Sequence, residues 1–180
     1  MKFCIISDIH GSAAAFKKCE EAFLREKADY LVLCGDYLNH GPRNPIPEGY
    51  DPQALAPMIN AWKLKIMGVR GNCDSEVDQM LLEFPCTSDY LIFFTGKRRC
   101  FVTHGHLYTE GNRPPLQKGD LFISGHTHVP VLKEEDGLIH LNPGSPSLPK
   151  EGSEPSYAMI TPDGVFLKKL DGTLISSMKL

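Results

Sequence analysis

The stretch Phe3-Cys4-Ile5-Ile6-Ser7-Asp8-Ile9-His10-Gly11 joins a short apolar run to a pair of candidate metal ligands. The run Phe3–Ile6 is typical of a buried strand. Ser12 is a candidate helix N-cap, and apolar residues recur at helical spacing over residues 13–27. Residues 30–34 are typical of a second buried strand. This strand–helix–strand order predicts a parallel pair of strands joined by a right-handed crossover.

The same pattern, an apolar run that ends in side chains able to bind a metal, recurs along the chain. The groups lie roughly 25 to 35 residues apart, about the length of one strand–helix–strand unit. They are Asp8-Ile9-His10, Gly35-Asp36, Gly71-Asn72, Thr103-His104-Gly105-His106 and Gly125-His126-Thr127-His128. Strand ends at one edge of a sheet converge on a common crevice, so we expect these groups to form one site.

The side chains in these groups predict a site for two adjacent cations. Side chains two apart on an extended backbone face the same way, so Asp8 and His10 should act as a ligand pair. The same reasoning pairs His126 with His128. Ligands of the Asp, Asn and His types suit Mn²⁺, Fe, Zn²⁺ or Ni²⁺ rather than Ca²⁺ or thiolate-bound zinc. Two such cations attract phosphate oxygens and lower the pKa of a bridging water, which indicates attack of hydroxide on phosphorus.

The rest of the pattern predicts two packed sheets with helices on their outer faces, in a single domain over residues 1–180. A long proline-rich loop is expected at 36–52, with helices at 52–62 and 75–84. Residues 95–98 have the composition of a hairpin turn. Further strands are expected at 65–69, 90–94, 99–103, 121–124, 129–133, 138–141, 157–161 and 165–170.

Length and composition are those of a soluble globular protein. The chain has 180 residues, 42% of them hydrophobic, and a net charge of −3, which predicts neither nucleic-acid nor membrane affinity. None of the six cysteines forms a C-x-x-C pair, which favours a reducing compartment. A strand pattern begins at once, and no apolar run approaches the ~18 residues of a membrane span. We therefore expect a cytoplasmic protein without a signal peptide.

The ordered motifs resemble those of the calcineurin-like metallophosphoesterase superfamily. The closer match is to the YfcE-type bacterial phosphodiesterases, and it runs from Met1 to about Tyr157. The segments that carry this closer match are Asn39-His40-Gly41-Pro42-Arg43-Asn44, Pro47-Glu48-Gly49-Tyr50, Val69-Arg70-Gly71-Asn72-Cys73-Asp74-Ser75-Glu76-Val77-Asp78-Gln79-Met80 and Asn142-Pro143-Gly144-Ser145. The resemblance implies a four-layer α/β/β/α sandwich of two mixed β-sheets flanked by helices, with a dinuclear metal centre.

The resemblance also implies how the ligands divide between the two divalent metal ions. One cation would be held by Asp8, His10, Asp36 and His128, and the other by Asp36, Asn72, His104 and His126. Asp36 would therefore bridge them, and His106 matches a position beside the metals. Metals of this family are commonly Mn²⁺, with Fe, Ni²⁺ or Zn²⁺ as substitutes.

One position departs from the wider superfamily. Many members have a His after Gly-Asn, where it contacts the phosphate and helps to protonate the leaving group, whereas this chain and the YfcE-type proteins have Cys. A thiol such as Cys73, with an ordinary pKa of about 8.5, is a poorer proton donor near neutrality than imidazolium. This favours substrates with good leaving groups, or another donor such as His40 or His106. Arg43 is a candidate for binding the substrate phosphate.

The sequence thus predicts a metal-dependent phosphodiesterase that acts on small phosphodiesters. The expected catalytic residues are Asp36, Asn72, Cys73 and His104, and the expected substrate-binding residues are Arg43, His40 and His106. One alternative is a phosphomonoesterase or cyclic-nucleotide phosphodiesterase on the same centre. Another is a non-catalytic scaffold like the retromer subunit of this fold, although that type lacks several ligands. No basic track predicts binding of long nucleic acid, and apolar residues in 80–84 indicate a partner surface, such as that of a homo-oligomer.

Overall fold

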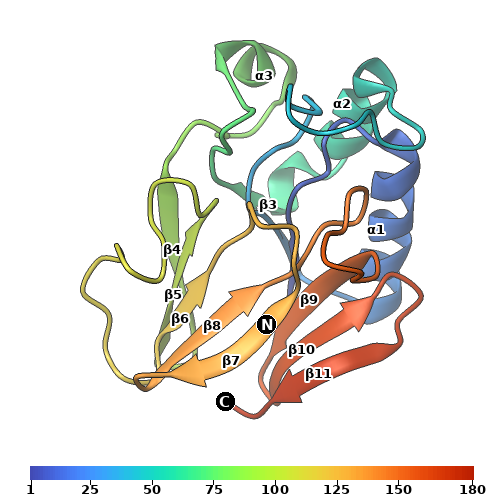
Figure 1. The fold of residues 1–180 in the computed structure, drawn as a ribbon. Helices are drawn as coiled ribbons and strands as arrows, with labels where there is room; N and C mark the ends of the chain where they lie inside the picture. Colours follow the sequence, from blue (N-terminus) through green and yellow to red (C-terminus); the bar gives the residue numbers. More distant parts are fainter.

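The computed structural model describes residues 1–180, which form two β-sheets packed face to face, with helices beside them (Figure 1). The helices are α1 (Ala13–Glu26), α2 (Pro52–Asn60) and α3 (Glu76–Leu81), and a 3₁₀ turn spans Lys63–Lys65. The strands are β1 (Phe3–Ile6), β2 (Tyr30–Leu33), β3 (Ile66–Gly68), β4 (Tyr90–Thr95), β5 (Arg98–Thr103), β6 (Leu121–Ile123), β7 (Val131–Glu135), β8 (Leu138–Asn142), β9 (Ser156–Thr161), β10 (Gly164–Lys169) and β11 (Leu174–Met178). No helix has the length and apolar character that crossing a bilayer requires.

The larger sheet has six strands in the order β11-β10-β9-β1-β2-β3. β1 is parallel to β2, with Phe3 opposite Tyr30, as the sequence predicts. On its other side β1 is antiparallel to β9, with Ile5 opposite Ala158. The N-terminal strand is therefore central, and all four of its residues are buried.

The smaller sheet has five strands in the order β4-β5-β6-β8-β7. Its three middle strands are parallel to one another, and the hairpins β4–β5 and β7–β8 add an antiparallel strand at each edge. Both sheets are thus mixed, as expected. Within each sheet the parallel strands point the same way; these are β1, β2 and β3 in the larger sheet and β5, β6 and β8 in the smaller one.

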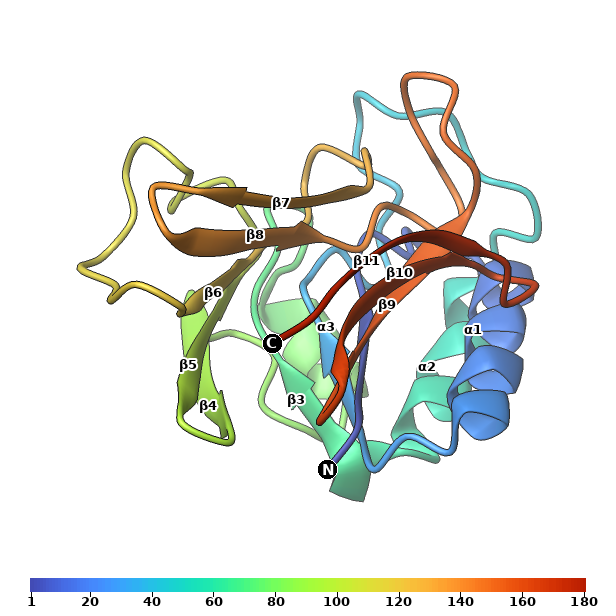
Figure 2. The ribbon, with the colours of Figure 1, turned by 90° about the horizontal axis from the view of Figure 1, so that it is seen from below.

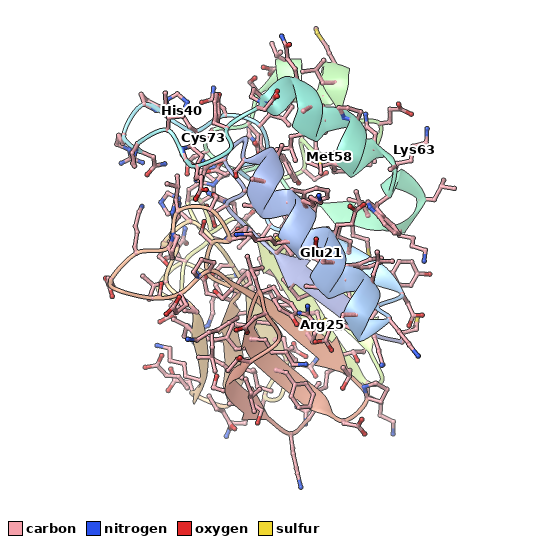
Figure 3. All side chains as sticks on the ribbon, turned by 90° about the vertical axis from the view of Figure 1, so that its right-hand side faces the viewer. Glu21, Arg25, His40, Met58, Lys63 and Cys73 are labelled. Carbon is pink, nitrogen blue, oxygen red and sulfur yellow. The ribbon has the colours of Figure 1, made fainter.

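Two apolar layers hold the sheets and helices together. Ile5 of β1 and Val32 of β2 lie in the layer between the two sheets, together with residues of β5, β6 and β8. Cys4 and Ile6 point the other way, into a layer shared with Phe16 of α1 and with α2. Figures 2 and 3 show α1 and α2 side by side on this outer face of the larger sheet. A strand buried on both faces needs an unbroken apolar run, which is what residues 3–6 supply.

The helix starts follow their caps. Ser12 caps α1, because its Oγ accepts a hydrogen bond from the N–H of Ala15 at 3.1 Å. Both later helices are shorter than expected. α2 ends at Asn60 and passes into a 3₁₀ turn. α3 ends at Leu81, where the next residue is already extended and Pro85 keeps the chain from returning to helix.

Two strands differ from expectation. β7 runs over Val131–Glu135 instead of 129–133, because Pro130 has no N–H to give to a strand ladder. β11 (Leu174–Met178) was not expected. It lies at the edge of its sheet and its residues are exposed or half-buried, so it lacks the apolar alternation that marks a strand.

Candidate metal centre

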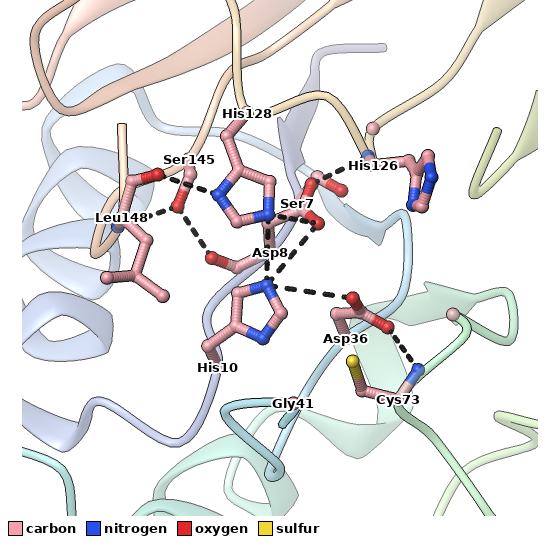
Figure 4. Close-up of polar contacts among 12 residues, drawn as sticks. Ser7, Asp8, His10, Asp36, Gly41, Cys73, His126, His128, Ser145 and Leu148 are labelled. Carbon is pink, nitrogen blue, oxygen red and sulfur yellow. Dashed lines mark hydrogen bonds and ion pairs between the residues drawn. The ribbon is translucent and has the colours of Figure 1, made fainter. Parts of the chain in front are cut away.

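All seven expected metal ligands lie just beyond strand ends at one end of the sheets; Figure 4 shows several of them together. Asp8 and His10 follow β1, Asp36 follows β2, Asn72 follows β3, His104 follows β5, and His126 and His128 follow β6. Parallel strands therefore bring together side chains that are up to 120 residues apart in the chain.

Asp8, His10 and His128 form a first group of donor atoms. The Oδ1 atom of Asp8 lies 3.3 Å from Nε2 of His128 and 3.7 Å from Nε2 of His10. The two Nε2 atoms are 3.1 Å apart. Oδ2 of Asp36 is 3.6 Å from Nε2 of His10, so Asp36 borders this group.

Asp36 also borders a second group, formed with Asn72, His104 and His126. Its Oδ2 lies 3.4 Å from Nε2 of His104. That Nε2 is 3.1 Å from Oδ1 of Asn72 and 3.3 Å from Nδ1 of His126. Two donor groups thus lie on either side of one carboxylate.

Backbone carbonyls determine which nitrogen of three imidazoles faces the centre. Nδ1 of His10 lies 2.9 Å from the carbonyl of Asn39, and Nδ1 of His104 lies 2.7 Å from that of Cys34. Nδ1 of His128 is 2.7 Å from the carbonyl of Leu148. A carbonyl only accepts hydrogen bonds, so each Nδ1 carries a proton, and it is Nε2 of each ring that faces inward and can bind a cation once it is deprotonated.

These donor atoms fit divalent cations. Oδ1 of Asp8 is buried without a hydrogen-bond partner, and an unpaired buried carboxylate oxygen is costly. The facing Nε2 atoms of His10 and His128 are both acceptors in their neutral rings, so neither can donate to the other. A cation bound between these atoms would satisfy all three, and its chemistry matches a carboxylate–imidazole donor set.

The electrostatics of the centre also favour positive charge. Burial alone would raise the pKa of Asp8, but His104, His10 and His128 hold that pKa well below its usual value. Burial alone would lower the pKa of His104, but the carboxylates of Asp8 and Asp36 raise it to about 9. Both carboxylates therefore stay ionised and stabilise a cation placed among them.

The backbone at the centre is turned, not extended. Asp8, His10, Asp36, His126 and His128 all have φ between 51° and 69°, in the left-handed region. The expectation of an extended backbone is therefore wrong for both pairs, although Asp8 and His10 still border the same donor group. His128 approaches the first donor group and His126 the second. Left-handed backbone costs a non-glycine residue about 1 kcal/mol or more, which the surrounding structure must offset.

Two glycines allow the loops to approach the carboxylates. A Cβ on Gly71 would lie 2.0 Å from Oδ1 of Asp36, and one on Gly125 would lie 1.8 Å from Oγ of Ser7. Neither position has room for any side chain.

Asp74 holds two of the ligand loops together, a role that the sequence did not reveal. Its buried carboxylate accepts hydrogen bonds from the N–H groups of Asp36, Tyr37 and Gly71 at 2.7 to 2.8 Å. Burial and the charge of Asp36 raise the pKa of Asp74 to about 7. The cap of the helix that follows is the next residue, Ser75.

A cavity of about 370 Å³ opens beside the donor groups. Arg43 and Cys73 line it as expected, together with Asp36, His126 and His128. Lys150 also lines it and was not expected, because it follows no strand and belongs to no motif. The structure gives no direct ion pair to Lys150 or to Arg43, so both positively charged side chains line this cavity without a carboxylate bound to them.

His40 and His106 lie near the cavity without lining it. The ring of His40 packs edge-on against Tyr50, with centroids 5.4 Å apart. The ring of His106 lies 5.3 Å from that of His104. Figure 3 shows His40 and Cys73 on neighbouring loops.

A model of the calcineurin-like phosphoesterase superfamily domain matches residues 1–164. Phosphodiesterase YfcE of Escherichia coli (strain K12) is 48% identical over 163 residues, which cover 91% of this chain and 89% of that protein. Probable metallophosphoesterase YsnB of Bacillus subtilis is 29% identical over 170 residues, covering 89% and 84%.

The solved structure of the E. coli phosphoesterase YfcE superposes with a TM-score of 0.97 at 45% identity, covering 99% of each chain. Vacuolar protein sorting 29 of Cryptosporidium parvum shares the fold alone, with a TM-score of 0.65 at 17% identity, covering 99% and 98%. The family match extends through every strand end that contributes to the centre, and this chain belongs to the calcineurin-like phosphoesterase superfamily.

Proposed function

We propose that this protein is a metal-dependent phosphodiesterase that hydrolyses small phosphodiesters. The observation that carries the proposal is the pair of donor groups around Asp36, together with the unpartnered Oδ1 of Asp8. The side chains of Arg43 and Lys150, neither of which has an ion-pair partner, line the cavity beside these groups. The relationship to YfcE, which is named a phosphodiesterase, supports the same reaction.

In this proposal the first cation is held by Asp8, His10, Asp36 and His128, and the second by Asp36, Asn72, His104 and His126. Asp36 would contribute to both sites, because its Oδ2 lies between the two donor groups. The family resemblance makes Mn²⁺ the metal proposed here, with Fe, Ni²⁺ or Zn²⁺ as substitutes, and nitrogen and oxygen donors without a thiolate accept each of these. When bound, the cations lower the pKa of water to supply a nucleophile, and they neutralise charge on the phosphate oxygens.

The cavity residues orient the substrate. Arg43 and Lys150 supply positive charge for the phosphate and for any further anionic group of the substrate. A cavity of about 370 Å³ admits a small diester, and a net charge of −3 without a basic track disfavours long nucleic acid.

Cys73 limits proton donation to the leaving group. Its N–H donates to Oδ1 of Asp36 at 2.8 Å, so its place beside the carboxylate is fixed. Burial and the charge of Asp36 raise the pKa of the Cys73 thiol to about 12. Burial and the charges of His104 and His126 lower the pKa of His106, so this ring is neutral near pH 7. Substrates with good leaving groups are therefore favoured.

Hydrolysis assays test the proposal directly. Metal-stripped protein is resupplied with Mn²⁺, Ni²⁺, Zn²⁺ or Mg²⁺ and assayed with bis-p-nitrophenyl phosphate and with p-nitrophenyl phosphate. We expect metal-dependent cleavage of the diester and little of the monoester. Preferred cleavage of the monoester would favour a phosphomonoesterase. Stoichiometric metal binding without turnover would favour the scaffold alternative.

A further inference from the structure

Residues 143–148 follow β8 and pass beside the first donor group, although they supply no candidate ligand (Figure 4). They include most of the motif Asn142-Pro143-Gly144-Ser145, to which the proposed function gives no role. Ser145 is completely buried, and its hydroxyl makes hydrogen bonds to two different parts of the chain. A buried hydroxyl whose partners lie in two loops holds those loops in place relative to one another.

The first partner of Ser145 is the backbone of Asp8. Oγ of Ser145 donates to the carbonyl of Asp8 at 2.7 Å, and Oγ of Ser147 donates to the same oxygen at 3.1 Å. No backbone N–H reaches this carbonyl, so the two hydroxyls are its only hydrogen-bond donors. Asp8 has a left-handed backbone, with φ of 58°, which is costly for a residue other than glycine. The hydroxyls therefore stabilise the turned backbone that carries the Asp8 carboxylate.

The second partner of Ser145 is the turn that orients His128. Oγ of Ser145 accepts a hydrogen bond from the N–H of Leu148 at 2.9 Å. The carbonyl of Leu148 accepts one from Nδ1 of His128 at 2.7 Å, which leaves Nε2 of that ring 3.3 Å from Oδ1 of Asp8. One hydroxyl thus joins the backbone of one candidate ligand to the residue that orients another (Figure 4).

The second donor group depends on other contacts. Nδ1 of His104 bonds to the carbonyl of Cys34, and the loop after β3 is held by the bond from the N–H of Gly71 to Asp74. Ser145 has no hydrogen bond to either of these loops. Loss of its hydroxyl should therefore affect one donor group and not the other.

We propose that Ser145 is a positioning residue for the first of the two proposed cations. Its hydroxyl fixes the carbonyl of Asp8 and the turn at Leu148 together, and so sets the distance between Oδ1 of Asp8 and Nε2 of His128. Removing the hydroxyl weakens binding of the first cation and spares the second. The inference rests on the metal binding in the proposed function, but not on the hydrolysis.

Zinc binding to the metal-free protein tests the proposal for each cation separately. Zn²⁺ is diamagnetic, so NMR of ¹⁵N-labelled histidine can follow Nε2 of His128 for the first cation and Nε2 of His104 for the second. The free Zn²⁺ concentration is set with a chelator buffer. Groups that orient a metal-bound histidine contribute roughly 10- to 100-fold to metal affinity. In Ser145→Ala we expect His128 to need at least about tenfold more free Zn²⁺ for half-saturation, and His104 to change less than about twofold.

Ser156→Ala is the matched control. Ser156 is equally buried, and its Oγ donates to the carbonyl of Pro143 in the same segment at 2.7 Å, but it has no hydrogen bond to a ligand loop. It should leave both titrations unchanged. Ser147→Ala is a second variant, at a half-buried position. It removes one of the two hydroxyls on the Asp8 carbonyl and leaves the bond to Leu148 in place, so the first cation should bind about threefold more weakly.

The outcomes separate this inference from the proposed function. Equal weakening at His128 and His104 in Ser145→Ala, or no weakening at either, would overturn the inference and leave the proposed function intact. Wild-type protein in which Zn²⁺ moves neither resonance would overturn both. If Ser145→Ala does not fold, Ser147→Ala and Ser156→Ala decide: weakening at His128 in the former alone supports the inference, and any other result overturns it.

Discussion

At the residue scale, the geometry of the centre depends on three histidines whose Nδ1 atoms are already hydrogen-bonded to backbone carbonyls. Each Nδ1 that donates to a carbonyl commits its ring to present Nε2, and each left-handed ligand residue turns its side chain away from the strand direction. The protein sustains this costly geometry because the neighbouring loops fit tightly around it, as Gly71 and Gly125 show.

The bridging role proposed for Asp36 can be tested by Asp36→Asn. An amide keeps the shape but removes the negative charge that both donor groups face, so activity should fall at least 100-fold. Metal content, measured by mass spectrometry of the dialysed protein, should fall for both cations. Wild-type metal content in this variant would contradict the bridging role.

Cys73→His should raise hydrolysis of diesters with poor leaving groups, because imidazolium donates a proton near neutrality more readily than this thiol. Rates for p-nitrophenyl and alkyl leaving groups should be compared. An unchanged ratio of the two rates would mean that residue 73 is not positioned to protonate the leaving group. Cys86→Ser, a change at a buried cysteine that does not line the cavity, is the control.

Arg43 and Lys150 are expected to bind the phosphate group of the substrate without taking part in bond breaking. Arg43→Ala and Lys150→Ala should each raise KM about tenfold or more for bis-p-nitrophenyl phosphate and change kcat less. Lys97→Ala, in the β4–β5 turn, should change neither value. An unchanged KM for Arg43→Ala would assign that side chain a structural role.

Residues of the centre differ in how far sequence could reveal them. The ligands follow apolar strands in a recognisable order, so their convergence is a consequence of parallel topology. Asp74 and Lys150 reach the centre only because loops from different parts of the chain fold next to one another. Local composition carries no signal for such contacts, and neither role was predicted.

At the scale of elements, α1 is attached to the larger sheet by a polar cluster at its C-terminal end. Oε1 of Glu26 accepts hydrogen bonds from the hydroxyl of Tyr157 and from Nζ of Lys168, both at 2.7 Å. Arg25 donates to the same tyrosine hydroxyl at 3.1 Å. The cluster joins the first helix to β9 and β10 near the other end of the sequence.

Glu26→Gln should lower the free energy of unfolding by about 1 to 2 kcal/mol at neutral pH. Burial alone would raise the pKa of Glu26, but the bonds from Lys168 and Tyr157 lower it. A lowered folded-state pKa gives stability above the ordinary pKa of Glu, and that stability is lost as pH falls through the folded value. Denaturation should therefore show a lower free energy of unfolding for Glu26→Gln than for the wild type at pH 7. Below about pH 4 the two proteins should unfold with the same free energy. Glu21→Gln, an exposed change on α1, should show no difference at either pH.

Elements were predicted well where burial or a cap imposes a pattern. Helix α1, with its Ser12 cap, and the buried strands β1 and β2 lie close to where the sequence places them. β11 was not predicted, because an exposed edge strand has no apolar alternation. The ends of α2 and α3 depend on turns that single-residue propensities describe poorly.

At the scale of the whole molecule, family membership and the sandwich of two mixed sheets are confirmed. The single-domain organisation, the cytoplasmic location and a homo-oligomeric state stay predictions. Met80 is 81% exposed, as a partner surface in this region would require. The six cysteines are all free.

Bound metal should stabilise the entire fold, because the donors come from five strands of two sheets. With Mn²⁺ at 100 times its dissociation constant, binding should add about 2.7 kcal/mol to the free energy of unfolding. For a chain of this length, this corresponds to a rise in Tm of about 5 to 11 °C. Calorimetry of stripped and Mn²⁺-loaded protein measures the difference. Asp36→Asn should show almost no rise, and an equal rise in this variant would place the stabilising metal elsewhere.

The central position of β1 has a consequence for synthesis on the ribosome. Its partner on one side, β9, is made about 150 residues later, which takes roughly 8 to 30 s at common rates of translation. Until then β1 presents an unpaired edge and apolar side chains on both faces, a template for pairing with the wrong chain. The same strand that positions the first two ligands is therefore the part of the nascent chain most in need of a chaperone.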